Sequence, residues 1–338
     1  MTVSPQQMQQ VRSAFTAPQE FWSSPLYRRL SAVVAEEPFL LRLAAHTRVG
    51  QVPTFAFFGA VHSLLLAGIE HPLADYYQSL RADHALEPRN AGPELIAFAR
   101  EHADEICEVL RTRLVQTNHV QRAVGLRLGL ATIEKSTAGV PIHLLEVGCS
   151  AGLVLRHHRY GYHLGQGVFG DCDSPVQLYT EWRSAEPIPN LDTIAPIASA
   201  TGIDLNPLDP SNESDRRWLE ALVWPEDRAK ADLLHAALAV AAETPLTTMT
   251  GDAIDLCGAW AADIPAGEPR VVFHCATRMH VPIDQVGLFD EAIDSTGLGG
   301  PLYRIAVEGD GIVISEPGSP PTKRFDVEGH LAWAKPSS

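Results

Sequence analysis

The sequence of 338 residues is 45% hydrophobic and carries a formal net charge of −15, from 26 Lys and Arg against 41 Asp and Glu. Such a composition supports a packed globular core. The negative charge repels a phosphate backbone or an anionic membrane, and the longest cationic cluster, Arg156-His157-His158-Arg159, is half histidine. We therefore expect no nucleic-acid partner and no membrane partner, and the composition leaves the oligomeric state open.

Three further features bear on location. Residues 1–7 lack the basic and apolar regions of a signal peptide, so we expect a cytoplasmic protein. The five cysteines are widely spaced and include no Cys-x-x-Cys pair, which predicts free thiols rather than disulfides or structural zinc. Residues 55–69 are strongly apolar, but they contain His62 and are fewer than the roughly 20 that a membrane span needs. We expect a buried helix there.

The apolar pattern changes near residue 137. Up to about Ser136 apolar residues recur at helical spacing and prolines interrupt the pattern, which predicts an all-helical N-terminal region over residues 1–136. Over residues 137–338 short apolar runs bounded by Gly, Pro and Asp alternate with helical segments. This pattern indicates βαβ units around a mostly parallel sheet, and the fold class is therefore α/β and Rossmann-like.

The second region is expected to contain six strands and four helices. The last two strands are separated only by Gly309-Asp310, a two-residue turn typical of an antiparallel hairpin. Residues 160–200 fit no βαβ unit, and we interpret them as an insertion with a strand pair that can form a lid or substrate wall. Residues 335–338 are expected to fray. The expected strands are 142–147, 197–204, 246–250, 270–275, 302–308 and 311–316, and the expected helices are 153–158, 216–222, 229–242 and 283–295.

The run Glu146-Val147-Gly148-Cys149-Ser150-Ala151-Gly152 is a tight turn between a strand and a helix. A dinucleotide fingerprint needs glycines where Ser150 and Leu153 stand, and a P-loop needs Lys after Gly152, so both are excluded. The run does match the Gly-x-Ser-x-Gly nucleophile elbow of α/β-hydrolases, with Ser150 as nucleophile and His330 as a later histidine. That fold needs several strands before the elbow, whereas the region before this turn is helical.

The same turn matches the acid-x-Gly-x-small-x-Gly motif of methyltransferases through Glu146, Gly148, Ser150 and Gly152, with Ser150 at the usual middle glycine. The acid can accept hydrogen bonds from the amino group of S-adenosylmethionine, and small residues let the backbone approach the cofactor. An alternative is an ordinary strand-to-helix turn.

Two more acids stand at the ends of the next expected strands. Asp204 is placed to bind ribose hydroxyls, as acids at that position do in other nucleotide folds, or else it forms a turn before Asn206-Pro207. Asp252 can accept from an adenine amino group or cap the helix that begins at Ala253. Because open α/β sheets bind ligands at the carboxyl ends of their strands, three acids at successive ends favour a cofactor site.

The sequence resembles an uncharacterised bacterial family, common in actinobacteria and known as a domain of unknown function, whose core looks like a class I S-adenosylmethionine-dependent methyltransferase. The resemblance covers nearly the whole chain and implies this fold, with S-adenosylmethionine as cofactor, far more than it implies a substrate. The motifs that carry it are Arg113-Leu114-Val115-Gln116-Thr117-Asn118, Leu144-Leu145-Glu146-Val147-Gly148-Cys149-Ser150-Ala151-Gly152-Leu153, Gly202-Ile203-Asp204-Leu205-Asn206-Pro207, Trp218-Leu219, Leu222-Val223-Trp224-Pro225-Glu226, Gly251-Asp252-Ala253 and Val272-Phe273-His274.

Outside the turn, His274 is the candidate catalytic base, because residues after the fourth strand face the transferred methyl group in this architecture. It is otherwise a hydrogen-bonded structural histidine. Either Thr117 or Asn118 is expected as N-cap of the helical run 120–133. The resemblance gives Gln116, Asn118 and His119 a role at the cofactor or acceptor mouth.

No metal site is expected, because the histidines near the turn lack a carboxylate or cysteine at a suitable spacing; these are His157, His158 and His163. The sequence thus predicts a methyltransferase that acts on a small neutral or cationic molecule. Its cofactor, S-adenosylmethionine, is expected to bind through Glu146, Gly148, Ser150, Gly152, Asp204, Asp252 and Ala253. The alternatives are a serine hydrolase that uses Ser150 and a non-catalytic ligand-binding protein.

Overall fold

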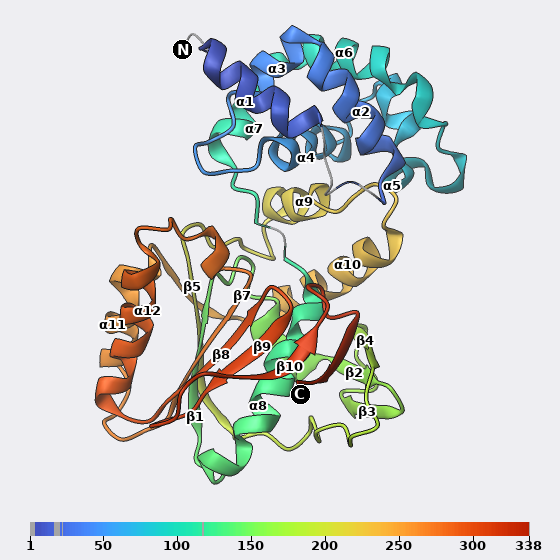
Figure 1. The fold of residues 1–338 in the computed structure, drawn as a ribbon. Coiled ribbons are helices and arrows are strands. Elements are labelled where there is room, and N and C mark those ends of the chain that lie inside the picture. The colour runs from blue at the N-terminus through green and yellow to red at the C-terminus, as the bar shows by residue number, and fades with distance from the viewer. Residues whose placement is uncertain (1–3, 17–20, 22, 117, 338) are drawn as a thin grey trace. The chain divides into compact units, whose positions relative to one another are not determined.

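The computed structural model describes residues 4–16, 21, 23–116 and 118–337. The chain forms two compact units (Figure 1). The first contains Met1–Thr117 and Asn212–Asp232, and the second contains Asn118–Ser211 and Leu233–Ser338. The boundary between the units therefore falls before the last helix of the region 1–136, and a segment from the second half of the sequence belongs to the first unit.

The first unit consists of helices joined by loops, with no strand among its described residues, as the spacing of apolar residues predicts. Four of its helices begin at a proline, which suits the first helical turn because the missing N–H has no partner there. The apolar stretch around His62 is the buried helix α4, whose Phe57 and Phe58 lie in the core. The helices are α1 Pro5–Thr16, α2 Pro25–Glu36, α3 Pro38–Ala44, α4 Pro53–Leu66, α5 Gln78–Arg81, α6 Ala91–Glu101, α7 Ala103–Thr112 and α9 Glu213–Ala221, with 3₁₀ turns at Pro72–Tyr76, Ala82–His84 and Pro88–Asn90.

Hydrogen bonds join the returning segment to the first part of this unit. The indole N–H of Trp218 donates to the carbonyl of Leu114 over 2.7 Å. The carboxylate of Glu226 accepts from the Ser24 hydroxyl at 2.7 Å and from the Leu26 N–H at 2.9 Å, so it holds the start of α2. The helical unit is therefore built from two separate stretches of sequence.

The second unit contains an 11-stranded mixed sheet among its described residues, ordered β3-β2-β4-β11-β10-β9-β8-β7-β1-β5-β6. The section β6-β5-β1-β7-β8 is parallel throughout. The chain enters this section at β1, adds β5 and β6 on one side, and then adds β7 and β8 on the other. The strands are β1 Ile142–Val147, β2 Gly161–Leu164, β3 Gly167–Gly170, β4 Gln177–Trp182, β5 Ile197–Asp204, β6 Thr247–Thr250, β7 Arg270–Cys275, β8 Leu302–Glu308, β9 Gly311–Ser315, β10 Thr322–Val327 and β11 Trp333–Pro336.

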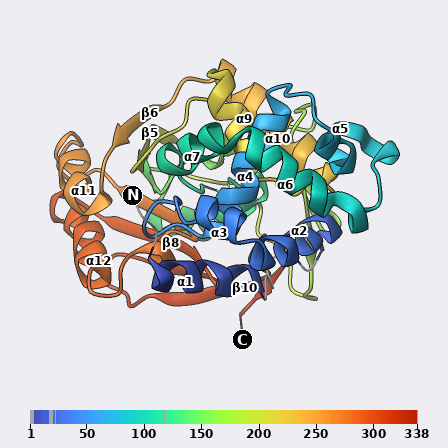
Figure 2. The same ribbon diagram turned by 90° about the horizontal axis from the view of Figure 1, so that it is seen from above.

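Helices cover both faces of the parallel section. The helix α8 (Ala123–Thr137) packs on β8, where a Cβ at Gly125 would lie 2.8 Å from Val307 and one at Gly129 would lie 2.5 Å from Ile305. The helices α11 (Ala253–Ala262) and α12 (Val286–Ser295) lie side by side (Figures 1 and 2) and share a core with Leu145, Val147 and Val272. Because side chains alternate along a strand, the intervening residue Glu146 belongs to the α8 face. The remaining helix of this region, α10 (Arg228–Glu243), begins in the segment assigned to the first unit.

Most predicted strands lie where expected, and the hairpin at Gly309-Asp310 is confirmed. The expected strand pair of residues 160–200 is β2 with β3, but β4 was not predicted. The expected helix 153–158 is instead a 3₁₀ segment, Val154–Arg159, with non-helical angles at Arg156. The expectation that residues 335–338 fray is wrong for the first three, since Lys335 and Pro336 pair with β10 and the Ser337 N–H donates to the Arg324 carbonyl at 2.9 Å. Ser338 lies outside the described residues. Among the described residues no helix is long and apolar enough to cross a membrane.

Candidate functional site

The glycine-rich turn follows β1, the strand that has β5 and β6 on one side in the sheet and β7 and β8 on the other. Gly148 and Gly152 have φ angles of +78° and +63°, a region that favours glycine. A Cβ at Gly148 would lie 2.4 Å from the Thr277 hydroxyl oxygen, and one at Gly152 would lie 2.4 Å from Leu246. The backbone angle therefore favours glycine at both positions, and the close approach of the short Thr277 side chain adds to this at Gly148.

Asp204, the last residue of β5, is in direct contact with this turn. Its Oδ2 accepts a hydrogen bond of 2.7 Å from the Ser150 N–H, and its Oδ1 accepts one of 2.9 Å from the Asn206 N–H. The carbonyl of Ser150 in turn accepts from the Leu208 N–H at 3.1 Å. The ends of β1 and β5 thus form one hydrogen-bonded unit, and two acids predicted for the site, Glu146 and Asp204, lie on neighbouring strands.

Glu146 is a buried carboxylate without a partner for one of its oxygens. Glu146 is only 5% exposed, and its Oε2 has no hydrogen-bond partner. Burial raises the pKa of Glu146 well above its ordinary value, the charge of Asp204 raises it further, and the guanidinium groups of Arg156 and Arg122 partly oppose these effects. An unpartnered buried carboxylate oxygen is costly, and Oε2 of Glu146 can accept a hydrogen bond from a ligand donor.

The side chain of Arg156 holds the glycine-rich turn through hydrogen bonds to its backbone. Its buried guanidinium donates to the carbonyls of Ala151 and Gly152 at 2.9 and 2.8 Å, and to those of Ala241 and Thr244 at 3.3 and 2.9 Å. These contacts join the last two residues of the turn, Ala151 and Gly152, to the end of α10. Because all four acceptors are backbone carbonyls, Arg156 has a structural function rather than a ligand-binding one.

Ser150 has a φ of +50°, which is strained for a residue with a side chain, and its hydroxyl is buried without a hydrogen-bond partner. No histidine of the described chain therefore activates this hydroxyl. His330, the histidine considered for a hydrolase, instead lies against His119, with ring centroids 4.3 Å apart and ring planes tilted by 39°. The nucleophile–base contact of a serine hydrolase is not formed by these residues.

Asp252 follows β6 and caps α11, since its Oδ1 accepts from the Ile254 N–H at 2.9 Å. The capping alternative from the sequence is therefore seen in the structure. Ala253 is the buried first residue of α11, next to the end of β6. The Gly251 N–H donates to the carbonyl of Asp204 at 2.9 Å, which places the third acid beside the second.

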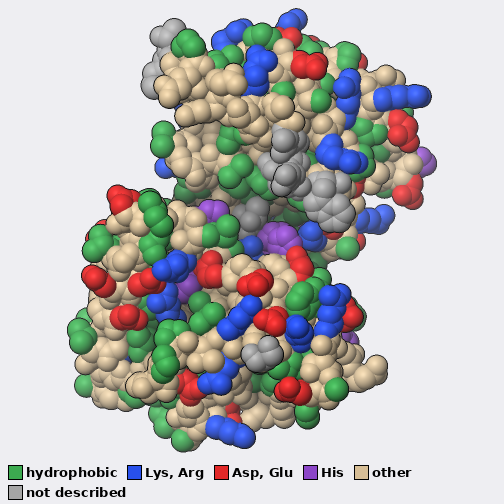
Figure 3. Space-filling view, in the orientation of Figure 1, with side chains coloured by type: hydrophobic (Ala, Val, Ile, Leu, Met, Phe, Trp, Pro, Cys, Tyr) green, Lys and Arg blue, Asp and Glu red, His purple; other side chains and the backbone are tan. Residues whose placement is uncertain are grey.

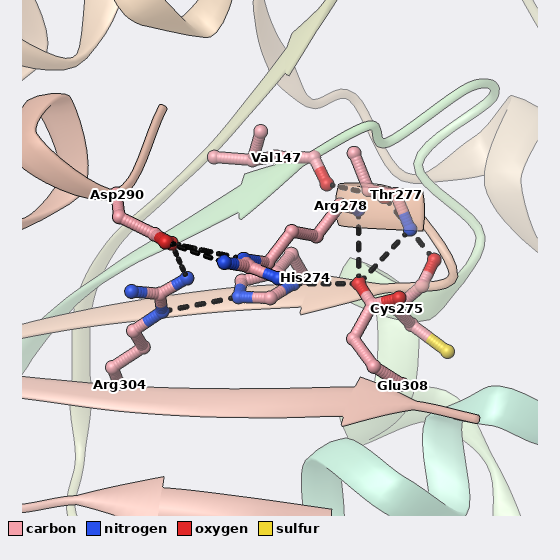
Figure 4. A network of polar contacts seen from close by, with 8 residues as sticks. All are labelled: Val147, His274, Cys275, Thr277, Arg278, Asp290, Arg304 and Glu308. Atoms are coloured by element: carbon pink, nitrogen blue, oxygen red, sulfur yellow. Dashed lines mark hydrogen bonds and ion pairs between the residues drawn. The ribbon is translucent and has the colours of Figure 1, made fainter. Parts of the chain in front are cut away.

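His274 lies on β7 in a network of charged side chains (Figure 4). It is fully buried, and its Nε2 accepts from Arg304 Nε at 3.1 Å. Because guanidinium has only donors, the ring proton is on Nδ1, which donates to Glu308 at 2.8 Å. Burial lowers the pKa of His274, and Arg304 lowers it further against the opposing effect of Glu308. Both ring nitrogens are thus engaged within the protein.

This network also positions the loop after β7. Oε1 of Glu308 accepts from the N–H groups of Thr277 and Arg278 at 3.1 and 3.0 Å. Burial alone would raise the pKa of Glu308, but hydrogen bonds from His274 and these amides lower it below its ordinary value. The Thr277 hydroxyl donates to the Val147 carbonyl at 3.1 Å, as Figure 4 shows. The loop after β7 is therefore fixed to the glycine-rich turn.

A second acid anchors the network on α12. Asp290 accepts from Arg304 at 2.6 Å and from Arg278 at 2.7 Å (Figure 4). The hydrogen bond from Arg278, together with Arg304, lowers the pKa of Asp290 to about 2.

On the face of the second unit seen in Figure 3, Lys and Arg side chains lie among Asp and Glu side chains.

The polar cluster before α8 divides between the two units. Gln116 belongs to the first unit, and Thr117 lies outside the described residues. The side-chain amide of Asn118 contacts the carbonyl of Cys149 at 3.5 Å, so this residue borders the turn. The expectation that Asn118 caps the helical run is wrong, because the run begins with a 3₁₀ turn at Val120–Arg122, whose N-cap position is His119, and no side chain caps it.

Sequence reasoning missed Arg122, Glu308 and Arg304. Glu308 has the clearest signal, since it ends β8 beside the strand that carries His274. The sequence spacing around Arg122 contains no such signal, and its position depends on how α8 packs on the sheet.

The fold and site define an α/β protein with a mostly parallel mixed sheet. Its acid-lined glycine-rich turn follows β1, between β5 and β7, and open α/β sheets bind ligands at such a switch point. The chain belongs to the family described as uncharacterized protein conserved in bacteria (DUF2332), whose match covers residues 13–332. No curated protein matches the sequence.

Proposed function

We propose that the protein is an S-adenosylmethionine-dependent methyltransferase of class I that acts on a small neutral or cationic molecule. The observation that carries the proposal is the set of three acids, Glu146, Asp204 and Asp252, at the ends of adjacent parallel strands around the glycine-rich turn. The order β6-β5-β1-β7-β8 supports it, because such a sheet places its ligand at the ends of β1 and its neighbours.

The residues at this edge fit such a cofactor. The unpartnered Oε2 of Glu146 would accept a hydrogen bond from the cationic amino group of the cofactor. Because this oxygen is buried, a charged donor suits it better than a neutral one. Asp204 is held at the strand end by backbone N–H groups, where it would accept from ribose hydroxyls. Asp252 would accept from the adenine amino group through the oxygen that does not cap α11.

The bound cofactor would supply an electrophilic methyl group for in-line displacement. The protein then has to orient the acceptor and exclude water, and precise positioning is the main source of rate in such a reaction. The loop after β7 is suited to this, since Glu308 and Val147 fix it through Thr277. His274 acts as a positioning residue in this proposal, because neither ring nitrogen is available to take a proton from a substrate.

The substrate class follows from charge. With a net charge of −15, the protein attracts cationic and tolerates neutral small molecules but repels polyanions. The three carboxylates at one edge of the sheet, those of Glu146, Asp204 and Asp252, likewise favour cationic over anionic molecules.

Calorimetric titration with S-adenosylmethionine and S-adenosylhomocysteine tests the proposal. We expect both to bind, and Asp204→Asn to weaken binding at least about tenfold, a loss typical of a hydrogen bond to a charged group. Asp263→Asn, which makes the same change at an exposed position after α11, should bind as the wild type does. Binding of neither compound, with fluorophosphonate labelling of Ser150, would instead support a hydrolase.

A further inference from the structure

Arg122 is held at the start of α8 by its sequence neighbours. The side-chain amide of Gln121 donates to the Tyr179 carbonyl and to the Thr180 hydroxyl, both at 2.8 Å. On the other side, Asn118 contacts the Cys149 carbonyl within the glycine-rich turn. The backbone that carries Arg122 is therefore fixed beside that turn.

The packing of α8 directs Arg122 toward the carboxyl ends of the strands. Gly125 lies directly on Val307, and Val307 is paired with Cys275, the last residue of β7. Residues three apart share a face of a helix, so Arg122 lies one turn beyond Gly125, past the ends of β7 and β8. Glu146 is on the same face of the sheet, the one that α8 covers. The charge of Arg122 acts on the pKa of both Glu146 and Cys275, in agreement with this position.

Three polar atoms at this edge are buried without a hydrogen-bond partner. They are Nε of Arg122, Oε2 of Glu146 and the hydroxyl oxygen of Ser150. Glu146 and Ser150 are 5% and 7% exposed. Arg122 and Glu146 have opposite charges, and no ion pair joins these two described side chains. Nε of Arg122 and Oε2 of Glu146 therefore retain hydrogen-bonding capacity toward a ligand.

We propose that Arg122 and Glu146 together recognise the two charges of an α-amino acid group, with Arg122 binding the carboxylate and Glu146 the ammonium. The inference rests on the proposed function, in which that group is the methionine part of the cofactor. The guanidinium group suits the carboxylate because its donors match the two oxygens in a plane. One acid alone would bind any cation, whereas an opposite pair selects a zwitterion.

The test compares two ligands that differ in the amino acid group. S-adenosylhomocysteine contains it, and 5′-methylthioadenosine retains the nucleoside and the sulfur but lacks it. For Arg122→Met we expect the calorimetric affinity for S-adenosylhomocysteine to fall about 10- to 100-fold, the range for a lost charge-assisted hydrogen bond. The affinity for 5′-methylthioadenosine should stay within about twofold. Arg122→Lys, which keeps the charge without the planar fork, should lie between wild type and Arg122→Met.

Arg159→Met is the matched control, since Arg159 is an exposed arginine of the same unit and its loss should change neither affinity. A thermal melt establishes that Arg122→Met is folded. Equal weakening of both ligands, or no weakening of either, would overturn the role of Arg122. If the wild type binds 5′-methylthioadenosine but not S-adenosylhomocysteine, the amino acid receptor is refuted while a nucleoside site remains. If it binds neither, the proposed function fails as well.

Discussion

The Ser150 N–H donates a 2.7 Å hydrogen bond to Oδ2 of Asp204, which joins the turn after β1 to the end of β5. The hydroxyl of Thr277 makes a similar connection from the other side, to the Val147 carbonyl. The glycine-rich turn is therefore fixed to the end of β5 and to the loop after β7. A preformed turn of this kind lowers the ordering cost of ligand binding.

Glu146→Gln should stabilise the ligand-free protein at alkaline pH and abolish cofactor binding. Because the pKa of Glu146 is raised in the folded state, the folded protein keeps a proton that the unfolded chain releases, and stability falls as pH rises from the ordinary value through the folded pKa. Because glutamine does not titrate, Glu146→Gln removes this pH dependence of the free energy of unfolding. We expect a gain of about 1–3 kcal/mol at pH 8 in denaturant unfolding. A variant that is less stable than wild type at pH 8 would show that the carboxylate is paired.

Gly148→Ala should destabilise the protein through both backbone strain and a clash with Thr277. Gly139 provides the control, because its φ of +75° matches the +78° of Gly148 while a Cβ there would meet no atom within 4 Å. We expect Gly139→Ala to lose about 1–2 kcal/mol from strain alone and Gly148→Ala to lose at least about 1 kcal/mol more. Adding Thr277→Ala should recover part of the second loss. Equal losses at both glycines would contradict close packing at the turn.

His274→Ala should lower stability and cofactor affinity together. The change leaves Arg304 and Glu308 without a shared partner and opens a buried cavity, which together cost about 2–4 kcal/mol. His280→Ala, on the exposed end of the same loop, should change neither quantity. If His274→Ala instead keeps stability and affinity but loses turnover with an alkaline-shifted pH profile, the histidine is a catalytic base.

Acidification should destabilise the helical unit through His62. Burial lowers the pKa of this histidine to about 4, so between pH 6.5 and 4 the unfolded chain takes up a proton that the folded chain does not. Stability therefore falls with pH in this window, by about 2 kcal/mol between pH 7 and 5 for this group. His62→Gln should reduce that slope in unfolding followed by Trp fluorescence. An unchanged slope would contradict a neutral buried His62.

The sequence predicted the buried parallel strands well, because short apolar runs such as 142–147 and 270–275 are bounded by turn residues and have few alternatives. It did not predict β10, whose start, Thr322-Lys323-Arg324, is polar and exposed. The helix expected after the turn is a 3₁₀ segment because the guanidinium of Arg156 bonds back to the carbonyls of Ala151 and Gly152.

The candidate site was predicted only where its residues follow strands. Glu146 and Asp204 meet because parallel neighbours end at one edge, which a pattern can indicate. The engagement of His274 by Arg304 and Glu308 depends on residues 30 and 34 positions away, and no local pattern predicts it. The position of Arg122 likewise depends on how α8 packs against β8.

Hydrogen–deuterium exchange with and without S-adenosylhomocysteine tests the central claim most directly. We expect slower exchange in peptides covering residues 146–153 and 204–208, and in those around Asp252, because these segments surround the proposed cofactor. Peptides from β10 should exchange as before. Unchanged exchange at the glycine-rich turn under saturating ligand, or protection confined to the helical unit, would contradict a cofactor site at the ends of β1, β5 and β6.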